Sequence, residues 1–232
     1  MGKSVAVVVG AGPGLGSALA RRFAEAGMAV AVARRRSDGL QGLADEIGGR
    51  AYACDATERA QVDDLFGIVE SDLGAPALVV FNAGIYKPGN ILEIAPEDFE
   101  RCWRVGCLGG FNVGQAAARR MVRAGEGTII FTGATAALRG SAGFANLAVP
   151  KFGLRALAQS MARELGPKGI HVAHVVIDGQ IGSDRPGYRE EERGEDAVLH
   201  PEDIAEAYYR LHVQPRSTWT LELDLRPWVE KF

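Results

Sequence analysis

The sequence is poor in the features that mark secreted, membrane or nucleic-acid-binding proteins. Its 232 residues include only three cysteines, Cys54, Cys102 and Cys107, whose spacing suits neither a metal site nor disulfides, so reduced thiols in the cytoplasm are expected. Apolar runs fall far short of a membrane span, and we see no charged-then-apolar leader. Positive charge is not in excess, since the formal net charge is −3. We therefore expect a cytoplasmic protein with a small-molecule substrate and with no nucleic acid, membrane or metal as partner.

The clearest positive feature is a glycine-rich turn near the N-terminus. An apolar run at residues 5–9 leads into Gly10-Ala11-Gly12-Pro13-Gly14-Leu15-Gly16 and then an amphipathic segment, a pattern that predicts strand, tight turn and helix. Such a turn lets the backbone approach a pyrophosphate, to which the helix N-terminus offers unpaired N–H groups. The alternative is a structural turn without a ligand. The residues expected at a dinucleotide are Gly10, Gly12, Gly14, Leu15 and Gly16.

Three arginines, Arg34, Arg35 and Arg36, follow a second predicted strand at residues 28–33. A cofactor without a 2′-phosphate requires an acidic residue here, and the nearest one, Asp38, lies beyond the strand end. Guanidinium groups make paired, charge-assisted hydrogen bonds to phosphate oxygens. The sequence thus favours NADP(H) over NAD(H), with Arg34 and Arg35 as ligands; a solvated basic loop is the alternative.

Short apolar segments alternate with helical segments along the rest of the chain. This alternation predicts a single α/β domain over residues 1–232, with a Rossmann-type, doubly wound parallel sheet and helices on both faces. We expect Thr57 to cap one helix and Pro96 to open a long one. A charge-rich stretch at residues 182–195 predicts a mobile substrate loop, which extends to about residue 198. Further strands are expected at residues 51–54, 77–81, 128–132, 171–176 and 219–223.

Four markers, in order, make the chain resemble the short-chain dehydrogenase/reductase family over nearly its whole length. They are Gly10-x-x-x-Gly14-x-Gly16, Cys54-Asp55, Asn82-Ala83-Gly84 and Lys151-Phe152-Gly153-Leu154. The resemblance implies a nicotinamide-dependent oxidoreductase that forms homodimers or homotetramers through the helix after Pro96 and the helix that carries Lys151. It also implies cofactor contacts at Asp55, Ala56, Asn82, Ala83, Gly84, Lys151 and Ile181.

The departures from the family fall on its chemistry. When the chain is aligned on Lys151, the family's tyrosine, serine and asparagine positions hold Leu147, Ala134 and Gly106. In the family, the tyrosine transfers the proton of the carbonyl oxygen, the serine hydrogen-bonds that oxygen, and the lysine holds the ribose. Loss of both hydroxyl groups slows the standard reaction by at least ~10⁴. We therefore do not expect ordinary ketone reduction by the standard route.

Four residues are candidates to replace the missing groups. Tyr86, shortly after Asn82-Ala83-Gly84, is the first candidate for the proton donor, although a wall of the substrate pocket is the more ordinary role for it. Tyr188 belongs to the predicted loop and could close over a ligand or stay solvated. Thr135 replaces the serine if the alignment shifts by one residue. Lys151 either holds the ribose or acts as an acid, because burial can lower a lysine pKa toward neutrality.

Other polar residues have less certain roles. Asp178 lies where the family backbone meets the nicotinamide amide, so its carboxylate could bond the amide or turn away from it. The histidines show no metal-ligand pairing, and residues 171 and 174 of one strand should face opposite sides of the sheet. A structural or solvated role is favoured for all four histidines, His171, His174, His200 and His212.

Pro150 falls inside the helix that is expected to present residue 147 and Lys151 one turn apart. A proline past the first turn removes a backbone hydrogen bond and crowds the carbonyl four residues earlier. With Asn146 as the N-cap, Pro150 would be the fourth helical residue. We therefore expect a late or bent start to this helix, and a displaced Lys151.

Three functions remain open at this point. The first is an NADP(H)-binding oxidoreductase that acts on a small carbonyl or alcohol with a relocated proton donor. The second is a non-catalytic, cofactor-binding scaffold, suggested by the simultaneous loss of serine, tyrosine and asparagine. The third is a non-redox lyase or isomerase, against which the intact glycine turn and Arg34 argue.

Overall fold

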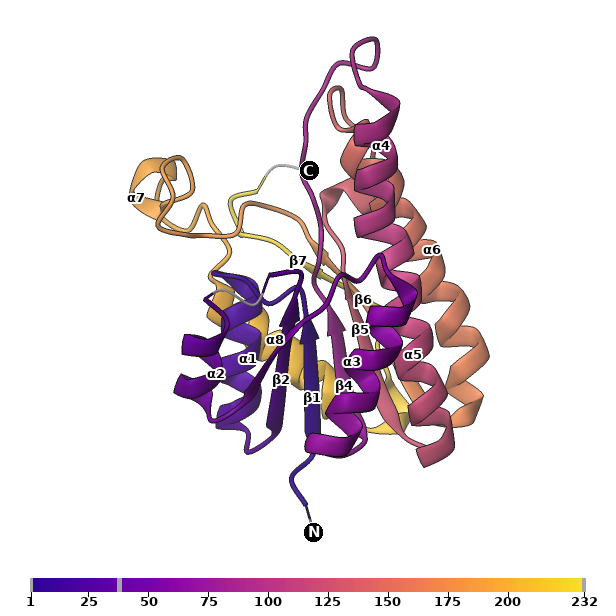
Figure 1. The fold of residues 1–232 in the computed structure, drawn as a ribbon. Helices are drawn as coiled ribbons and strands as arrows, with labels where there is room; N and C mark the ends of the chain where they lie inside the picture. The colour runs from indigo at the N-terminus through magenta and orange to yellow at the C-terminus, as the bar shows by residue number, and fades with distance from the viewer. Residues whose placement is uncertain (1, 37–38, 231–232) are drawn as a thin grey trace.

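The computed structural model describes residues 2–36 and 39–230 and shows one parallel sheet between two layers of helices (Figure 1). The strand order is β3-β2-β1-β4-β5-β6-β7. Strands β1 to β3 are added toward one edge of the sheet and β4 to β7 toward the other, so the strand order reverses between β1 and β4. In doubly wound sheets, ligands bind outside the carboxyl ends of the strands at such a point. The predicted Rossmann-type fold is confirmed. Asp38, the acidic residue considered in the cofactor prediction, lies outside the described residues. The strands are β1 (Val5–Val9), β2 (Ala29–Arg34), β3 (Arg50–Ala53), β4 (Pro76–Phe81), β5 (Gly127–Thr132), β6 (Ile170–Ile177) and β7 (Glu222–Leu225).

Each face of the sheet is covered by three helices. On one face, α3, α5 and α6 bury a core that includes Phe66 and Phe131. On the other, α1, α2 and α8 bury a second core around Phe23 and Tyr208. No helix in the described part of the chain is long and apolar enough to cross a membrane. The helices are α1 (Leu15–Glu25), α2 (Gln41–Ile47), α3 (Arg59–Asp72), α4 (Pro96–Trp103), α5 (Gly109–Ala124), α6 (Ala145–Leu165), α7 (Glu190–Arg193) and α8 (Pro201–His212).

The last strand starts three residues later than the sequence suggests, at Glu222–Leu225 instead of residues 219–223. A 3-10 turn, Arg216–Thr218, precedes it. Trp219 then stacks its ring on His171 at 5.0 Å between centroids instead of entering the ladder. The aromatic residue that suggests a strand therefore packs across the sheet edge, and pairing starts only after it.

Pro96 occupies the first position of α4, as expected. The long helix that it opens is not uniform, because a π-helical turn, Arg104–Leu108, joins α4 to α5. Such turns are often found at functional sites. Gly106, at the family's asparagine position, lies in this turn.

Two expected helix starts are wrong. Helix α3 has Glu58 as its N-cap, with no side-chain cap bond; Thr57 instead donates its hydroxyl to the Asp55 carboxylate, at 2.9 Å. Helix α6 does not start late, because its N-cap is Phe144 instead of Asn146 and it runs from Ala145 through Pro150. Its first turn is tied down by Asn146, whose amide donates to the carbonyl of Lys87 at 3.0 Å, which helps the helix to tolerate the proline. A bent start with a displaced Lys151 stays a prediction.

The predicted substrate loop projects from the body of the molecule beside the carboxyl end of the sheet and contains the short helix α7 (Figure 1). Its two ends are joined by a parallel bridge between Ile181 and Leu199. The C-terminal segment reaches the loop, because the Trp228 indole donates to the Asp196 carboxylate at 2.9 Å. Whether the loop is mobile stays a prediction.

Candidate cofactor and active site

The glycine turn is shaped by close backbone contacts. A β-carbon built on Gly10 would lie 2.5 Å from the backbone nitrogen of Ala83, and one on Gly16 would lie 2.8 Å from Cα of Ala11. Gly14 has a φ of +90°, which a residue with a side chain rarely adopts. Helix α1 begins directly after Gly14, at Leu15, so its unpaired N–H groups lie at the turn. The turn is therefore built for close approach of an anion.

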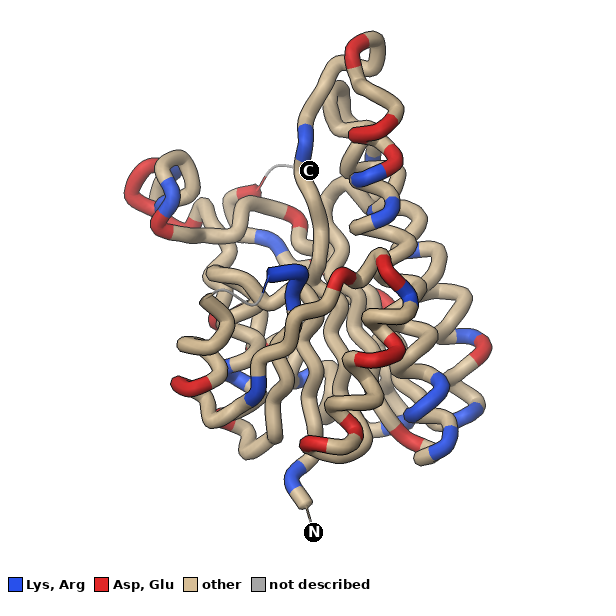
Figure 2. Tube along the Cα trace, in the orientation of Figure 1, with Lys and Arg blue, Asp and Glu red and all other residues tan. Residues whose placement is uncertain are grey.

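A cavity of about 810 Å³ lies between the glycine turn and the end of β2. Figure 2 shows basic residues gathered where the chain leaves β2. Arg34 bends back along this segment, with its Nε donating to the carbonyl of Arg36 at 2.6 Å. The Asp55 carboxylate turns to Thr57, whose backbone N–H it accepts at 3.0 Å. The lining includes these residues of the sequence prediction: Gly10, Gly12, Arg34, Arg35, Asp55, Ala56, Asn82, Ala83 and Gly84.

Arg101 also lines this cavity, and sequence reasoning missed it. It projects from α4, one helical turn before Val105, which lines the same cavity. Arg101 therefore adds a fourth guanidinium to the three that follow β2. No local sequence pattern indicates that Arg101 binds a cofactor. It is far from β2 along the sequence, and only the fold brings both segments to one cavity.

A second cavity, of about 1020 Å³, continues from the glycine turn to the start of α6. It brings together residues from six separate parts of the sequence, and its walls near α6 are mostly apolar. At the family's serine and tyrosine positions, Ala134 and Leu147 face it, so neither position supplies a hydroxyl group there. Predicted site residues in its lining are Gly14, Leu15, Gly16, Tyr86, Ala134, Leu147, Lys151, Ile181 and Tyr188.

Lys151 is buried at the floor of this second cavity. Its Nζ donates to the backbone carbonyl of Thr132 at 2.7 Å. Across residues 2–36 and 39–230, no carboxylate oxygen lies within 4 Å of that nitrogen. Because burial disfavours the charged ammonium, the pKa of Lys151 is lowered to about 8. A lysine in this state holds and releases a proton near neutral pH.

Both candidate tyrosines line the second cavity. Tyr86 is 52% exposed, and its ring lies against Phe144 at 5.4 Å between centroids. Tyr188 belongs to the loop before α7, where its backbone N–H donates to the carbonyl of Arg185 at 3.0 Å. The two phenols therefore approach the cavity from different elements, and Tyr86 comes from the segment directly after β4.

Thr135 does not face the cavity in the way that a serine substitute would. Its hydroxyl donates to the buried carboxylate of Asp178 at 2.6 Å, and it is absent from the lining. Arg226 lies on the other side of that carboxylate, 3.8 Å from Oδ2. Asp178 is thus held between a hydroxyl and a guanidinium, and a contact with the nicotinamide amide stays a prediction.

The histidines have structural positions. His174 is fully buried on β6, with Nδ1 3.2 Å from the Glu222 carboxylate, and burial lowers its pKa to about 4. His171 is buried too, with Nε2 2.9 Å from the carbonyl of Thr220. His212 reaches the hydroxyl of Thr128 at 3.0 Å. No cluster of three or more metal-ligating side chains is present in the described ranges.

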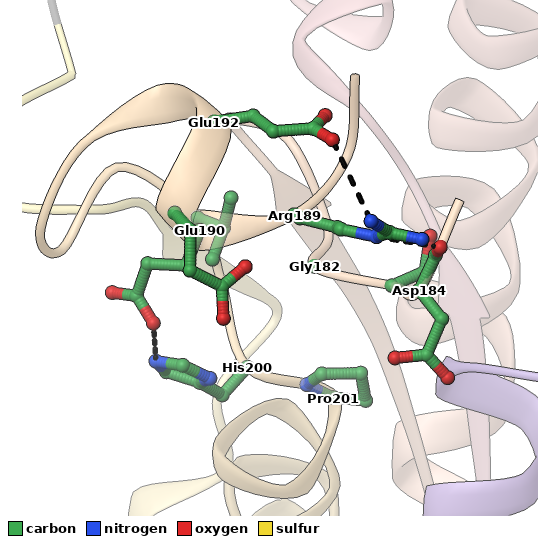
Figure 3. A pocket seen from close by; sticks show the side chains of 10 residues that line it. Gly182, Asp184, Arg189, Glu190, Glu192, His200 and Pro201 are labelled. Carbon is green, nitrogen blue, oxygen red and sulfur yellow. Dashed lines mark hydrogen bonds and ion pairs between the residues drawn. The ribbon is translucent and has the colours of Figure 1, made fainter. Parts of the chain in front are cut away.

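His200 forms part of a third hollow, of about 700 Å³, on the outer side of the loop. Figure 3 shows Glu190 pointing toward His200, 3.5 Å from Nε2, while Arg189 lies between Glu192 and Asp184. Gly182 and Pro201 line both this hollow and the second cavity. The loop thus lines both the hollow and the second cavity.

Together, the strand order, the glycine turn and the cavities on either side of it define a nucleotide-binding oxidoreductase fold. The sequence matches the short chain dehydrogenase family over residues 4–187. The 3-oxoacyl-[acyl-carrier-protein] reductase MabA of Mycobacterium tuberculosis is 35% identical over 178 residues, which cover 77% of this chain and 69% of that protein. The corresponding reductase FabG of Escherichia coli is 29% identical over 182 residues, covering 78% and 74%.

Solved structures agree with this relationship. A crystal structure of a short-chain dehydrogenase from Rhodopseudomonas palustris is similar with a TM-score of 0.84 and 39% identity, over 97% of this chain and 99% of that one. An alcohol dehydrogenase from the archaeon Thermococcus sibiricus, complexed with 5-hydroxy-NADP, gives a TM-score of 0.87 and 26% identity over 98% of both chains. The chain belongs to the short-chain dehydrogenase family.

Proposed function

We propose that this protein is an NADP(H)-dependent oxidoreductase that acts on a small carbonyl or alcohol, with Tyr86 as proton donor. The observation that carries the proposal is the shared cavity, which Tyr86, Lys151 and the glycine turn all line. A family member with no tyrosine at residue 147 needs another acid within reach of the substrate oxygen, and a tyrosine is among the side chains that serve this role. Relatives named as reductases and a solved relative complexed with an NADP derivative support the assignment.

The residues have distinct roles in this proposal. Arg34 and Arg35 would bind the 2′-phosphate, and the glycine turn with the N-terminus of α1 would bind the pyrophosphate. Lys151 would hold the ribose, and Ile181 would cover the nicotinamide. When bound, the nicotinamide supplies or accepts the hydride. Cofactor contacts at Asp55, Ala56, Asn82, Ala83 and Gly84 complete the proposed site.

Substrate would enter beside the loop at residues 182–198. This loop lines the second cavity with residues that include Tyr188. Closure of the loop would exclude water from the reacting carbonyl. The apolar walls near Leu147 favour a substrate with an apolar portion next to its carbonyl group.

A non-catalytic, cofactor-binding role is the second candidate. It is favoured by the state of the usual catalytic positions: Ala134 and Leu147 line the cavity, and the neighbouring Thr135 hydroxyl is engaged by Asp178. In that case NADP(H) would bind and no substrate would turn over. A lyase or isomerase without a dinucleotide is a weaker candidate, because the glycine turn is intact.

The test begins with NADPH and NADH binding to cofactor-stripped protein, measured by fluorescence titration. Each sample is then followed at the nicotinamide absorbance against a panel of aldehydes and ketones. We expect NADPH to bind more tightly and at least one carbonyl to be reduced. Binding without turnover would support the non-catalytic role, and no binding would overturn both cofactor-dependent proposals.

Tyr86→Phe then tests the proton donor. The ring contact with Phe144 is retained in this variant while the hydroxyl is lost. We expect kcat to fall by about 10²–10⁴ with little change in NADPH affinity. Tyr188→Phe is the matched control and should keep most of the activity. Equal effects of the two substitutions would remove Tyr86 from the proposed mechanism.

We also propose a homodimer or homotetramer. Support comes from partly exposed aromatic side chains on the helices through which the family is expected to associate, namely Trp103, Phe111 and Phe152. Apolar side chains on a surface often mark contacts between subunits. Light scattering coupled to size exclusion would give the mass of the particle, and a monomer at micromolar concentration would contradict the proposal.

A further inference from the structure

Lys151 has an unusual set of neighbours for a buried lysine. Its nitrogen makes one hydrogen bond, to the Thr132 carbonyl, and within the described residues it has no carboxylate partner within 4 Å. Burial of an ammonium without a counter-charge is costly, and such a group tends to lose its proton instead. The neutral amine that results carries a lone pair and is a nucleophile.

The amine is also accessible from the cavity. Lys151 belongs to its lining, together with Ala134 and Leu147. Gly84 leaves space beside the amine, because a β-carbon built there would lie 3.8 Å from Nζ. With leucine at residue 147, no phenol competes for the lysine from that position. A small molecule that enters the cavity can thus meet an amine flanked by apolar walls.

We propose that Lys151 captures a small, largely apolar aldehyde in this cavity as a covalent imine. Cavity size and wall chemistry select the ligand class, since about 1020 Å³ accommodates a small aldehyde and, among the described residues, no carboxylate oxygen lies within 4 Å of the amine. This inference goes beyond the proposed redox function, because it requires no nicotinamide.

The chemistry balances without an oxidant or a reductant. The Nζ lone pair attacks the carbonyl carbon, and a C–N bond forms while the carbonyl oxygen takes up a proton. The resulting carbinolamine then loses its hydroxyl group as water, the nitrogen gives up its remaining proton, and a C=N bond is left. A lysine pKa of about 8 supports this step, because it leaves a substantial fraction of the amine unprotonated near neutral pH.

The lysine content makes the proposal easy to test. The chain has five lysines, at positions 3, 87, 151, 168 and 231. Lys87 is ion-paired with Asp98, and Lys168 lies 3.7 Å from Glu164 on the surface. The lysines at positions 87, 151 and 168 are well separated along the sequence, so each falls in its own proteolytic peptide and a labelled peptide identifies the lysine that reacted. Lys168 serves as the internal reference for an exposed amine.

The experiment incubates the full chain, free of cofactor, with propanal and sodium cyanoborohydride, which reduces an imine to a stable secondary amine. Labelled peptides are quantified by mass spectrometry between pH 6.5 and 10. We expect Lys151 to be labelled at least about tenfold faster than Lys168 near pH 7.5, with the ratio falling toward pH 10, where ordinary lysines also lose their protons. Labelling of Lys168 with no labelling of Lys151 at any pH would overturn the proposal.

Two variants guard against indirect effects. Lys151→Arg keeps a long cationic side chain but cannot form an imine, and circular dichroism would establish that it is folded. Leu147→Trp keeps the lysine and narrows the cavity, so we expect it to slow labelling of Lys151 at least about fivefold while Lys168 is unaffected. Unchanged labelling in Leu147→Trp would overturn the assignment of the reaction to this cavity.

Labelling in the presence of NADPH distinguishes this inference from the proposed function. If both hold, saturating NADPH shields Lys151 and slows its labelling. Labelling of Lys151 in a protein that fails to bind NADPH would leave the inference standing and remove the redox proposal. NADPH binding by a protein whose Lys151 is never labelled would do the reverse.

Discussion

Pro150 lies directly against Gly106, so that a β-carbon built on Gly106 would be 2.9 Å from Cβ of Pro150. The glycine belongs to the π-helical turn between α4 and α5, and the proline belongs to α6. The departure from the family at Gly106 and the proline inside α6, 44 positions apart, therefore form one packing arrangement. The side chain of an asparagine at residue 106 would therefore clash with Pro150 unless residue 150 were also changed or displaced.

A double-mutant cycle tests this pairing. Gly106→Ala should lower the free energy of unfolding by about 1–3 kcal/mol, because the added methyl group overpacks the contact. In the background of Pro150→Gly, which removes the contacting β-carbon, the same substitution should cost markedly less. Urea denaturation of the four proteins gives the coupling energy. Additive effects would mean that the two residues do not share the contact.

Restoration of the usual hydroxyl groups should raise activity. Ala134 and Leu147 line the same cavity as Lys151, so serine and tyrosine at these positions would face the same space. We expect Ala134→Ser with Leu147→Tyr to raise kcat for NADPH-dependent carbonyl reduction by about 10² or more. Leu147→Phe in place of the tyrosine adds bulk without a hydroxyl and should give no gain. An equal gain from the phenylalanine variant would assign the effect to cavity shape.

The arginines around the first cavity should set the cofactor preference. Arg34→Ala removes a charge-assisted interaction that is typically worth about 1.5–3 kcal/mol, which corresponds to about 10- to 150-fold in Kd for NADPH. Binding of NADH should change little, because it has no 2′-phosphate. Arg101→Ala should weaken NADPH binding in the same selective way. Arg123→Ala, on the outer surface of α5, is the control, and fluorescence titration with both cofactors measures all three.

The buried His174 should make stability depend on pH. Its pKa is about 4 in the folded protein, against an ordinary value of 6.5, because burial disfavours the imidazolium. Between these pH values the unfolded chain binds a proton that the folded chain does not. The free energy of unfolding should therefore fall as pH drops from 6.5 to 4, by about 3 kcal/mol in total, and stay flat above 6.5 as far as this group is concerned.

His174→Asn isolates that contribution. The asparagine amide can replace Nδ1 as the partner of Glu222 but does not titrate. Urea denaturation between pH 4.5 and 7.5 should show a shallower pH dependence in the variant, by up to ~1.4 kcal/mol per pH unit. Identical slopes in the two proteins would mean that other groups account for the acid sensitivity.

The fold was predictable because its signals are local. Each strand is a short apolar run, and each helix carries apolar positions at helical spacing, so their alternation specifies a parallel sheet. The glycine turn was predictable for the same reason, since its tight geometry restricts a contiguous stretch that begins at Gly10. Lys151 and the residues at the usual serine and tyrosine positions, Ala134 and Leu147, line one cavity, while their roles stay predictions.

What could not be predicted depends on contacts between distant segments. The hydrogen bond from Thr135 to Asp178 spans 43 positions, and nothing local to either residue announces it. Arg101, on α4, lines the first cavity together with the arginines at the end of β2, which are more than 60 positions away along the chain. Pro150 suggested a disrupted helix, since the vacant space beside Gly106 that receives it lies on another element. Sequence patterns describe each element but not which elements meet.

The bridge between Ile181 and Leu199 has a consequence for how this protein could diversify. It joins the two ends of the loop between β6 and α8, so that the paired residues fix where the loop begins and ends. Loop length adds little to the cost of joining two such ends, since that cost grows only with its logarithm. The segment can therefore be lengthened, shortened or exchanged as a cassette, which would retune what the cavity admits while the cofactor end of the molecule stays unaltered.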